Sequence, residues 1–586
     1  MHGATVHSGI GNAETEFRVW APSVRKIKVR LLNGGDFAMQ PDSRTEGEFA
    51  AVLPAQAGDR YFYIVDENKP VPDPVSRCLP LGVHGPTEII DPESFQWSDQ
   101  SWRGLDITDY IIYELHVGAF TSARTFDAAI ERLDYLKNIL GISAIELMPV
   151  AAFPGKRNWG YDGVSPYAVQ ASYGGPAGLK RLVDAAHRVG LAVVLDVVYN
   201  HLGNEGNYLG MFAPYFSGRR QTPWGDAVNY DGPDSAGVRR YVIENALYWV
   251  GEYHLDGLRL DAIQTIFDDS QPHIVAEIQE NVQRLAAKLG RRVCVIAETD
   301  QNLASLVRKK QDVGFGLDAM WSDDFHHAVH AVLTGERRGY YQDFGKKEQI
   351  VRALNEGFVF QGEYFNFWKA KRGTPAAGVP LPAHVICIQN HDQVGNRARG
   401  ERLTALVPRG ARKLAAALLL LAPHSPLLFM GQEFDESAPF QFFTDFGDPQ
   451  LQKAVSEGRR KEFKDFRWQD VPDPQDPATF ERSKLHWDLA EPAGQNVPRG
   501  TFEMREWYSK LLKLRRRLVM AGERTCHAEV SEGYLRMQVP AKHPKLKVIA
   551  RFPDQRGQKG HESGGWRKIL ASDEDGYVVE VFEQAE

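Results

Sequence analysis

One pattern constrains the fold of this chain more than any other: from about residue 108, an apolar strand-like run followed by an amphipathic helical stretch occurs eight times. Strands that alternate with helices form parallel sheets, and eight such units close into a barrel. The sequence therefore predicts an α/β protein built on a (β/α)8 TIM barrel. The predicted strands are Tyr110–His116, Ala144–Met148, Ala192–Asp196, Gly257–Asp261, Val293–Glu298, Leu317–Trp321, Val385–Ile388 and Pro426–Met430.

The two ends of the chain differ from this pattern. Residues 1–98 alternate short β-type runs with Gly, Pro, Asn and Asp turns, which predicts an N-terminal β-sandwich. Residues 521–586 return to short strands, so we expect a small C-terminal β domain after a barrel over 99–520. Two insertions, 201–234 and 433–500, follow the third and eighth strands. We expect the first, an irregular loop rich in aromatic residues, to shape a binding cleft.

Charge and composition exclude some classes of partner. The 586 residues carry 69 basic and 76 acidic side chains without a basic block, which argues against nucleic acid or an anionic membrane as a partner. The longest apolar run, Leu414–Ala422, is about half of a membrane span. The N-terminal residues lack the pattern of a secretory signal. We therefore expect a cytoplasmic protein with a neutral ligand.

Metal and disulfide chemistry are not indicated. The four cysteines, Cys78, Cys294, Cys387 and Cys526, are far apart and form no C-x-x-C pair. The histidines of interest show no metal-binding spacing such as H-x-x-x-H. We expect free, mostly buried thiols, no metal and no cofactor.

Polar residues stand where several predicted strands end. Because parallel barrel strands all emerge at the same rim, side chains spread over nearly two hundred residues of sequence are expected to meet there. Carboxylates gathered in this way suit the breaking of a glycosidic bond. The residues concerned are Asp196, His201, Arg259, Asp261, Glu298, Asn390, His391 and Asp392.

The strand Gly257–Asp261 shows how such a site is built. Alternation along a strand sends Arg259 and Asp261 to one face and Leu258 and Leu260 to the other. An arginine on the same face would hold the carboxylate ionised and fixed, as a nucleophile requires. Glu298 follows an apolar run that would raise its pKa and keep it protonated as a general acid. Taken singly, each of these residues also fits a purely structural role.

The set, in this order, resembles the four sequence signatures of the α-amylase superfamily of retaining α-glucoside hydrolases and transferases. The matching strings are Asp196-Val-Val-Tyr-Asn-His201, Gly257-Leu-Arg-Leu-Asp261, Ala297-Glu298 and Asn390-His-Asp392. The resemblance spans about residues 108–520, and the superfamily's N-terminal sandwich, barrel and C-terminal β domain agree with the organisation predicted above.

Residue roles follow from this resemblance. It implies Asp261 as nucleophile, Glu298 as acid and then base, and Asp392 as the carboxylate that grips the hydroxyls of the distorted sugar. Arg259, His201, Asn390 and His391 would line the same subsite, with Asp196 orienting the arginine. Tyr161, in Trp159-Gly-Tyr-Asp162, would stack beneath the sugar through its ring rather than its hydroxyl.

Longer strings resemble the branch of the superfamily that cuts the α-1,4 bond beside a terminal trehalose and releases free trehalose. The implied partners are malto-oligosyltrehalose and related α-glucans, with Trp321, Asp324 and His326 as candidates for shaping the leaving-group side. Two positions depart: Asn204 replaces a proline common in that branch, and Gln264 replaces a lysine usual in amylases. Asn200 matches a calcium ligand of many amylases, but no cluster of partner acids follows it, so we expect no required ion. The strings are Asn200–Tyr208, Trp321–His327, Asn390–Gly400, Ser437–Phe443 and Gly458–Phe463.

Two alternatives stay open at this point. A glycogen branching enzyme would share the sandwich and the carboxylates but transfer the cleaved chain to another glucan instead of to water. A noncatalytic glucan-binding protein on an amylase barrel is the alternative from another class. Such relatives usually lack one of the carboxylates, whereas this chain has Asp261, Glu298 and Asp392.

Overall fold

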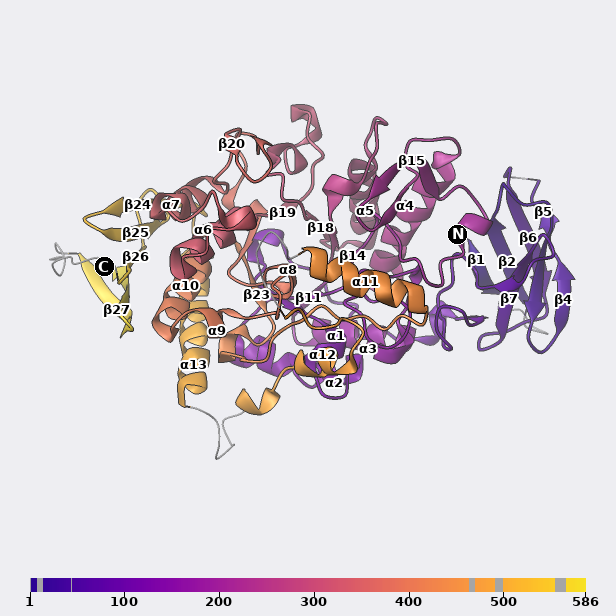
Figure 1. Ribbon diagram of the computed structural model, residues 1–586, viewed down its shortest axis with the longest axis horizontal. Helices are drawn as coiled ribbons and strands as arrows, with labels where there is room; N and C mark the ends of the chain where they lie inside the picture. Colours follow the sequence, from indigo (N-terminus) through magenta and orange to yellow (C-terminus); the bar gives the residue numbers. More distant parts are fainter. Residues whose placement is uncertain are drawn as a thin grey trace.

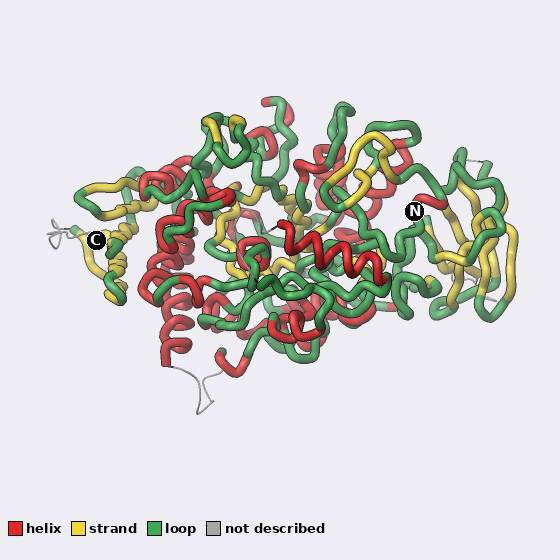
Figure 2. Tube along the Cα trace, viewed as in Figure 1, coloured by secondary structure: helices red, strands yellow, loops and turns green. Residues whose placement is uncertain are grey.

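A closed barrel of eight parallel strands forms the centre of the protein (Figures 1 and 2). The computed structural model describes residues 2–7, 14–43, 45–462, 470–490, 499–553 and 565–585. The strands pair in sequence order and the last closes on the first, which confirms the predicted barrel. They are β10 (Ile112–Leu115), β11 (Ala144–Leu147), β14 (Ala192–Val197), β17 (Gly257–Leu260), β18 (Cys294–Ala297), β19 (Ala319–Trp321), β22 (His384–Cys387) and β23 (Ser425–Phe429).

Alternation along the strands sorts side chains between two cores. A separate apolar cluster that includes Ile112, Val194 and Ile296 fills the inside of the barrel. Leu258 and Leu260 belong instead to the larger cluster, which we place between the strands and the surrounding helices because strand neighbours point to opposite faces. Arg259, between these leucines, therefore points into the barrel as predicted, and Asp261 follows at the end of the strand.

Helices surround the barrel and two insertions rise from its rim. The first insertion, predicted to be irregular, contains a hairpin of β15 (Phe216–Thr222) and β16 (Gly225–Val228). The described part of the second insertion contains α11 (Pro449–Glu462) and α12 (Pro477–Arg482). The other helices are α1 (Val117–Phe120), α2 (Phe126–Ile130), α3 (Gly175–Arg188), α4 (Ser235–Glu252), α5 (Ile274–Leu289), α6 (Asp323–Thr334), α7 (Lys347–Glu356), α8 (His391–Gly395), α9 (Leu403–Leu406), α10 (Arg409–Leu421) and α13 (Arg499–Leu514).

Antiparallel sheets stand at both ends of the chain, at opposite sides of the view in Figure 1. Two N-terminal sheets have the orders β1-β2-β6-β5 and β4-β3-β7-β8, with β9 (Thr87–Glu88) pairing to β7. The C-terminal sheet has the order β24-β25-β26-β28-β27, and α10 packs against it. The strands are β1 (Gly3–His7), β2 (Glu14–Trp20), β3 (Ile27–Leu31), β4 (Gly35–Ala38), β5 (Gln40–Pro41), β6 (Glu48–Leu53), β7 (Arg60–Val65), β8 (Pro70–Val71), β24 (His527–Ser531), β25 (Tyr534–Val539), β26 (Leu546–Arg551), β27 (Trp566–Glu574) and β28 (Tyr577–Gln584).

These sheets fall inside the segments predicted for the two terminal domains, whose boundaries near residues 98 and 520 stay predictions. All four cysteines are free and three of them are buried, which agrees with the sequence. In the part of the chain that the structure describes, no helix combines the length and the apolar character needed to cross a membrane.

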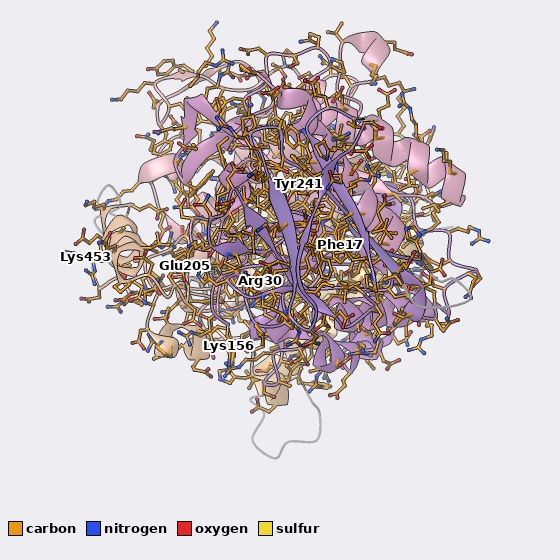
Figure 3. All side chains as sticks on the ribbon, turned by 90° about the vertical axis from the view of Figure 1, so that its right-hand side faces the viewer. Phe17, Arg30, Lys156, Glu205, Tyr241 and Lys453 are labelled. Carbon is orange, nitrogen blue, oxygen red and sulfur yellow. The ribbon has the colours of Figure 1, made fainter. Side chains whose placement is uncertain are left out.

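The N-terminal sandwich packs directly on the barrel helix α4. Gly237 lies against the ring of Trp20 so closely that a Cβ atom there would be 2.1 Å from the ring. Arg240 donates to Glu48 at 2.8 Å, and the hydroxyl of Tyr241 donates to the carbonyl of Pro74 at 2.9 Å. Figure 3 views the molecule from this side, with Tyr241 and Phe17 labelled. The two parts are thus joined by a buried aromatic ring and polar bonds.

A buried histidine, His187, connects the segment before the first barrel strand to the barrel. It does so at the end of the barrel opposite the predicted site. The ring of His187, at the end of α3, lies 2.8 Å from Asp99 through Nδ1 and 2.8 Å from Asp256 through Nε2. Trp102 stacks on the same ring, and Arg291 lies 3.0 Å from Asp256. Although burial opposes the charged imidazole, the two carboxylates raise the pKa of His187 above its ordinary value.

The pH dependence of this cluster has a definite sign. The imidazolium contribution to stability is complete below about pH 6.5, the ordinary pKa of histidine, and is lost as the pH rises through the raised pKa. The pKa values of Asp99 and Asp256 are lowered despite burial, since His187 and, at Asp99, His254 donate to them. Their contribution is complete above about pH 3.9 and is lost as the pH falls. The cluster therefore stabilises the fold most between these two values.

We predict that His187→Gln lowers the urea midpoint of unfolding, by the equivalent of about 1–3 kcal/mol, because Asp99 and Asp256 lose the imidazolium that they share and keep His254 and Arg291 as partners. The loss should be larger at about pH 5.5 than at about pH 9. Unfolding in urea followed by tryptophan fluorescence at both pH values measures it, with His7→Gln as the control because the side chain of His7 is 57% exposed. An equal loss at both pH values would contradict a charged His187.

Candidate active site

Six of the residues predicted for the site line one cavity of about 820 Å³ at the carboxyl ends of the barrel strands. A cavity of this size suits an oligosaccharide segment rather than a large partner. Each residue lies just beyond a strand, in a rim loop or at the start of a short helix, which is the placement that parallel strands impose on such residues. The six are Tyr161, His201, Asp261, Glu298, His391 and Asp392.

The guanidinium group of Arg259 stands behind this wall and joins four carboxylates. Its Nη1 donates to Asp196 at 2.7 Å and to Asp261 at 2.8 Å. Its Nη2 lies 3.6 Å from Glu298 and 3.9 Å from Asp392. The side chain of Arg259 is fully buried, where an unpaired charge is costly. One cation thus fixes the positions of acids from four different segments of the chain.

Both carboxylate oxygens of Asp261 are held. Oδ1 accepts the bond from Arg259, and Oδ2 accepts a bond from the amide of Asn200 at 2.8 Å. The same amide donates to the backbone carbonyl of Asp261, also at 2.8 Å. Asn200, which the sequence matched to a calcium-binding position, is therefore placed as a support for Asp261. Among the described residues, no group of three or more His, Cys, Asp or Glu side chains is arranged to hold a metal ion.

Glu298 is in a different environment from Asp261. Burial raises its pKa well above the usual range, and the nearby charges of Asp261 and Asp392 raise it further against the effect of Arg259. Its Oε2 accepts a bond of 2.6 Å from the backbone N–H of Ala262. Ala262 has a left-handed backbone conformation, with φ 41°, which is strained for a residue with a side chain. The residue after Asp261 therefore orients Glu298, and burial favours the protonated form of Glu298.

His391 depends on a residue that the sequence analysis missed. Nδ1 of His391 lies 2.5 Å from Glu114 on β10, and its backbone N–H donates to the other oxygen of Glu114 at 2.9 Å. On the other side, Nε2 lies 3.3 Å from Asp392. Although burial opposes the charged form, Asp392 and Glu114 raise the pKa of His391 to about 9. The sequence did contain a signal for Glu114: it is a glutamate at an inward-facing position of an otherwise apolar strand.

Tyr161 is held by its hydroxyl as well as by its ring. The preceding Gly160 has φ 110°, and a Cβ atom there would be 2.3 Å from the carbonyl of Pro149, so this turn requires glycine. The hydroxyl of Tyr161 donates to Asp196 at 2.6 Å and lies 2.7 Å from Nε2 of His391. The sequence analysis assigned the role of Tyr161 to its ring, and that role stays a prediction; the structure adds two hydrogen-bond partners for the hydroxyl.

We predict that Tyr161→Phe costs about 1–3 kcal/mol in transition-state binding, because Asp196 loses a buried donor. The measurement is kcat/KM on an α-1,4-glucan for Tyr161→Phe beside Tyr161→Ala, which loses the ring as well. Wild-type kcat/KM in Tyr161→Phe would contradict a role for the hydroxyl and restore the account based on stacking alone.

The outer predicted residues lie behind the cavity wall rather than on it. Trp321 is buried inside the barrel with the Arg259 guanidinium 4.2 Å above its ring. Asn390 caps α8, since its side chain accepts from the backbone of residue 393 at 2.7 Å. Asp324 is fully buried and pairs with Arg372 at 2.9 Å. His326 is buried too, so these residues meet a substrate only through the side chains in front of them.

The wall positions belong instead to neighbours of the predicted residues. Asp323 and His327 line the cavity in place of Asp324 and His326, because adjacent residues of a helix such as α6 point in different directions. The pKa of Asp323 is raised to about 7 by burial and by Asp392. Other lining residues that the sequence analysis did not select include Trp159, Asp162, Trp224, Tyr340, Phe365, Phe367, Arg372, Asn396 and Arg459.

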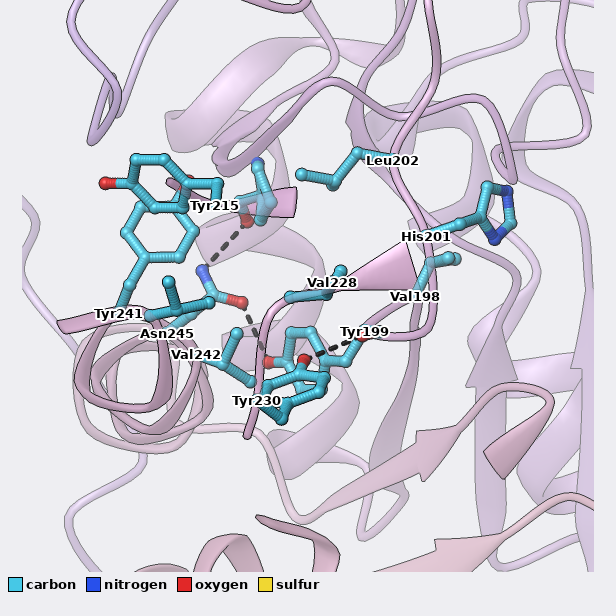
Figure 4. A pocket seen from close by; sticks show the side chains of 12 residues that line it. Val198, Tyr199, His201, Leu202, Tyr215, Val228, Tyr230, Tyr241, Val242 and Asn245 are labelled. Atoms are coloured by element: carbon cyan, nitrogen blue, oxygen red, sulfur yellow. Dashed lines mark hydrogen bonds between the residues drawn. The ribbon is translucent and has the colours of Figure 1, made fainter. Parts of the chain in front are cut away.

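The loop after β14 has its own apolar core. Tyr199 donates to Asn245 at 2.8 Å, and Tyr230 donates to the backbone carbonyl of Tyr199 at 2.7 Å. Figure 4 shows these side chains together, with the ring of His201 turned away from them. On its other side that ring stacks on Trp224, with centroids 5.0 Å apart. The small pocket among these residues is therefore packing that supports His201.

Three comparisons relate the chain to known proteins. The alpha amylase catalytic domain family matches residues 90–214. The chain is 46% identical over 514 residues to malto-oligosyltrehalose trehalohydrolase from Saccharolobus solfataricus, covering 88% of this chain and 87% of that protein. It is 46% identical over 525 residues to the enzyme of the same name from Arthrobacter ramosus, covering 88% and 90%.

A solved structure agrees with these matches. A protein from Salmonella typhimurium, solved under the provisional name alpha amylase, superposes with a TM-score of 0.89 at 40% identity and covers 100% of this chain and 99% of that one. The similarity therefore extends over the sandwich, the barrel and the C-terminal sheet together.

Proposed function

Because the chain belongs to the malto-oligosyltrehalose trehalohydrolases of the α-amylase superfamily, we propose that it hydrolyses the α-1,4 bond beside the terminal trehalose of malto-oligosyltrehalose and releases trehalose. The chemical part of this proposal rests on one observation: the guanidinium group of Arg259 lies within 3.9 Å of four carboxylates at one cavity. Glycoside hydrolysis with retention needs a nucleophilic carboxylate and a protonated one in unlike environments.

The proposed reaction has two steps. In the first, a carboxylate oxygen of Asp261 bonds to the anomeric carbon while the bond to the leaving oxygen breaks, and Glu298 gives its proton to that oxygen. In the second, Glu298 takes a proton from water, whose oxygen bonds to the anomeric carbon as the ester to Asp261 breaks. The anomeric configuration is retained because each step inverts it. Trehalose leaves after the first step and the shortened glucan after the second.

The other residues prepare these steps. Asn200 and Arg259 keep Asp261 oriented, while burial keeps the pKa of Glu298 high enough to hold the proton that it donates. We assign to Asp392 and to the protonated His391 the binding of hydroxyl groups on the sugar being distorted. His391 supplies a hydrogen-bond donor and Asp392 an acceptor, a combination that suits adjacent hydroxyls.

We predict that Glu298→Gln loses about two to four orders of magnitude in kcat on a natural oligosaccharide, since a sugar alkoxide leaves slowly without a proton. An α-glucosyl fluoride should be cleaved with a far smaller loss in the first step, because fluoride departs without general acid catalysis. Steady-state rates on both substrates, beside those of Asp261→Asn, make the comparison. Equal losses on both substrates would remove Glu298 from the acid role.

We predict at least a hundredfold higher kcat/KM on malto-oligosyltrehalose than on malto-oligosaccharide of equal length, a difference of about 2.7 kcal/mol in transition-state binding. Trehalose is a bent, nonreducing disaccharide, so a cavity shaped for it fits a linear maltose unit poorly. Chromatography of the products should give trehalose as the released disaccharide. Amylose incubated in parallel serves as the control.

The outcomes separate the candidates. Branch points in amylose would indicate a transferase, as in a branching enzyme. Equal cutting of the two oligosaccharides would indicate an amylase without trehalose specificity. Binding of glucan without any cleavage would indicate a noncatalytic protein.

A further inference from the structure

Helix α11 from the second insertion forms part of the wall of the active-site cavity. It crosses the middle of the view in Figure 1, in front of the barrel. Its residues Leu451, Val455 and Arg459 line the same cavity as Asp392. The insertion therefore belongs to the site, although it enters the chain after the last barrel strand.

The end of α11 is bonded to the helix that carries Asp392. Nη1 of Arg459 donates to Oδ1 of Asn396 at 3.2 Å, and Nη2 of the same guanidinium donates to the carbonyl of Gly395. Nδ2 of Asn396 then donates to Oδ1 of Asp392 at 3.0 Å. The side chain of Arg459 is 9% exposed and its guanidinium lies over the ring of Phe442, so it is fixed on several sides.

The hydrogen bonds that join Arg459, Asn396 and Asp392 are compatible with only one orientation of the Asn396 side-chain amide. A guanidinium only donates and a carboxylate only accepts, so the amide oxygen must face Arg459 and the amide nitrogen must face Asp392. Asp392 shares its other oxygen, Oδ2, between His391 at 3.3 Å and Arg259 at 3.9 Å. Asn396 is thus closer to the carboxylate of Asp392 than His391 or Arg259 is, and it sets the rotation of that carboxylate.

The other end of α11 is held by the rim of the barrel. Oε2 of Glu205 accepts from the backbone N–H groups of Gly447 and Asp448, at 2.8 and 3.2 Å, just before the helix begins. His84 lies 3.5 Å from Oε1 of Glu205 and 2.7 Å from the hydroxyl of Tyr208. In Figure 3, Glu205 lies between the labelled Lys453 of α11 and Arg30 of the N-terminal sandwich. The helix is therefore fixed at both ends, at one of them through a residue of the N-terminal part.

We propose that Arg459 and Asn396 are positioning residues of the reaction: through them, helix α11 fixes the carboxylate of Asp392 against the sugar that is distorted. This proposal rests on the function assigned to Asp392 above. It gives the insertion a part in the chemical step in addition to enclosing the cavity. Arg459 acts through Asn396, so its effect requires the Asn396 amide.

The test is a double-mutant cycle on kcat and KM with malto-oligosyltrehalose. Asn396→Ala should lower kcat about tenfold to a hundredfold, the effect of one hydrogen bond to a charged group, with little change in KM. Asn396→Asp, which keeps the shape but turns an oxygen toward Asp392, should lose at least as much. Arg459→Ala should lower kcat by about tenfold. The double variant Asn396→Ala/Arg459→Ala should lose no more than Asn396→Ala alone.

Two further variants provide controls. Arg459→Lys keeps the charge but presents one compact donor group in place of a fork, so it should recover only part of the loss. Arg460→Ala removes the neighbouring arginine, which is exposed, and should leave kcat unchanged. Thermal unfolding midpoints of all variants show whether any has lost its fold. Asn396→Asp, as the isosteric change, keeps the test valid where an alanine variant is unstable.

Three results would overturn the proposal. Losses that multiply in the double variant would mean that Arg459 acts independently of Asn396. A raised KM with unchanged kcat would mean that these residues only bind substrate. Unchanged kcat in Asn396→Asp would remove Asn396 from the site. Release of maltose but no trehalose by the parent enzyme would contradict the proposed function instead, and the cycle would then be run on malto-oligosaccharide.

Discussion

The burial of the Arg259 guanidinium is the constraint on which the rest of the site depends. A cation enclosed in a barrel is tolerated only with anions and hydrogen-bond acceptors around it. Asp196 and Asp261 supply direct bonds, and Glu298 and Asp392 lie within 3.9 Å. Each anion is also costly to bury without the cation. Burial of Arg259 therefore favours an arrangement in which the four segments of chain that carry these acids end at one place.

The same network places the carboxyl groups of the site in unlike surroundings. Asp261 accepts hydrogen bonds at both oxygens, one from Arg259 and one from Asn200. Glu298 has one backbone donor, and its pKa is raised well above the usual range by burial and by the nearby charges of Asp261, Asp392 and Asp323. Asp196 lies between these cases, with a pKa raised to about 6 by burial and held down by Arg259. Further hydrogen-bond donors at Glu298 would lower its pKa and leave less of it protonated, so the small number of donors around it favours its role as a general acid.

The sequence predicted the barrel and the gathering of Asp261, Glu298 and Asp392 at its rim for the same reason. Strand period, strand order and the rule that polar residues gather at the carboxyl ends are all local signals, and they located Asp261, Glu298 and Asp392 correctly at one cavity. The wall beyond them depends on side-chain direction and on distant contacts. Asp324 is buried, whereas its neighbour Asp323 lines the cavity. Helix geometry decides which of two adjacent residues faces the cavity, and composition does not encode that direction.

Selectivity for trehalose must come from this less predictable wall. The bond that is cut is an α-1,4 bond in malto-oligosyltrehalose and in malto-oligosaccharide alike, so Arg259 and the carboxylates meet the same atoms in both. The difference lies on the leaving-group side, in the shape and hydroxyl pattern of one disaccharide. Trp224 and Phe367 line the cavity while remaining 48% and 40% exposed, which leaves ring faces open to the apolar face of a sugar. Charged residues on the same wall, such as Arg372 and Asp323, offer donors and acceptors that a wrongly shaped disaccharide would leave unpaired. On the proposed function, the carboxylates at the barrel rim break the glucosidic bond, and the side chains of the surrounding cavity wall select which bond is cut.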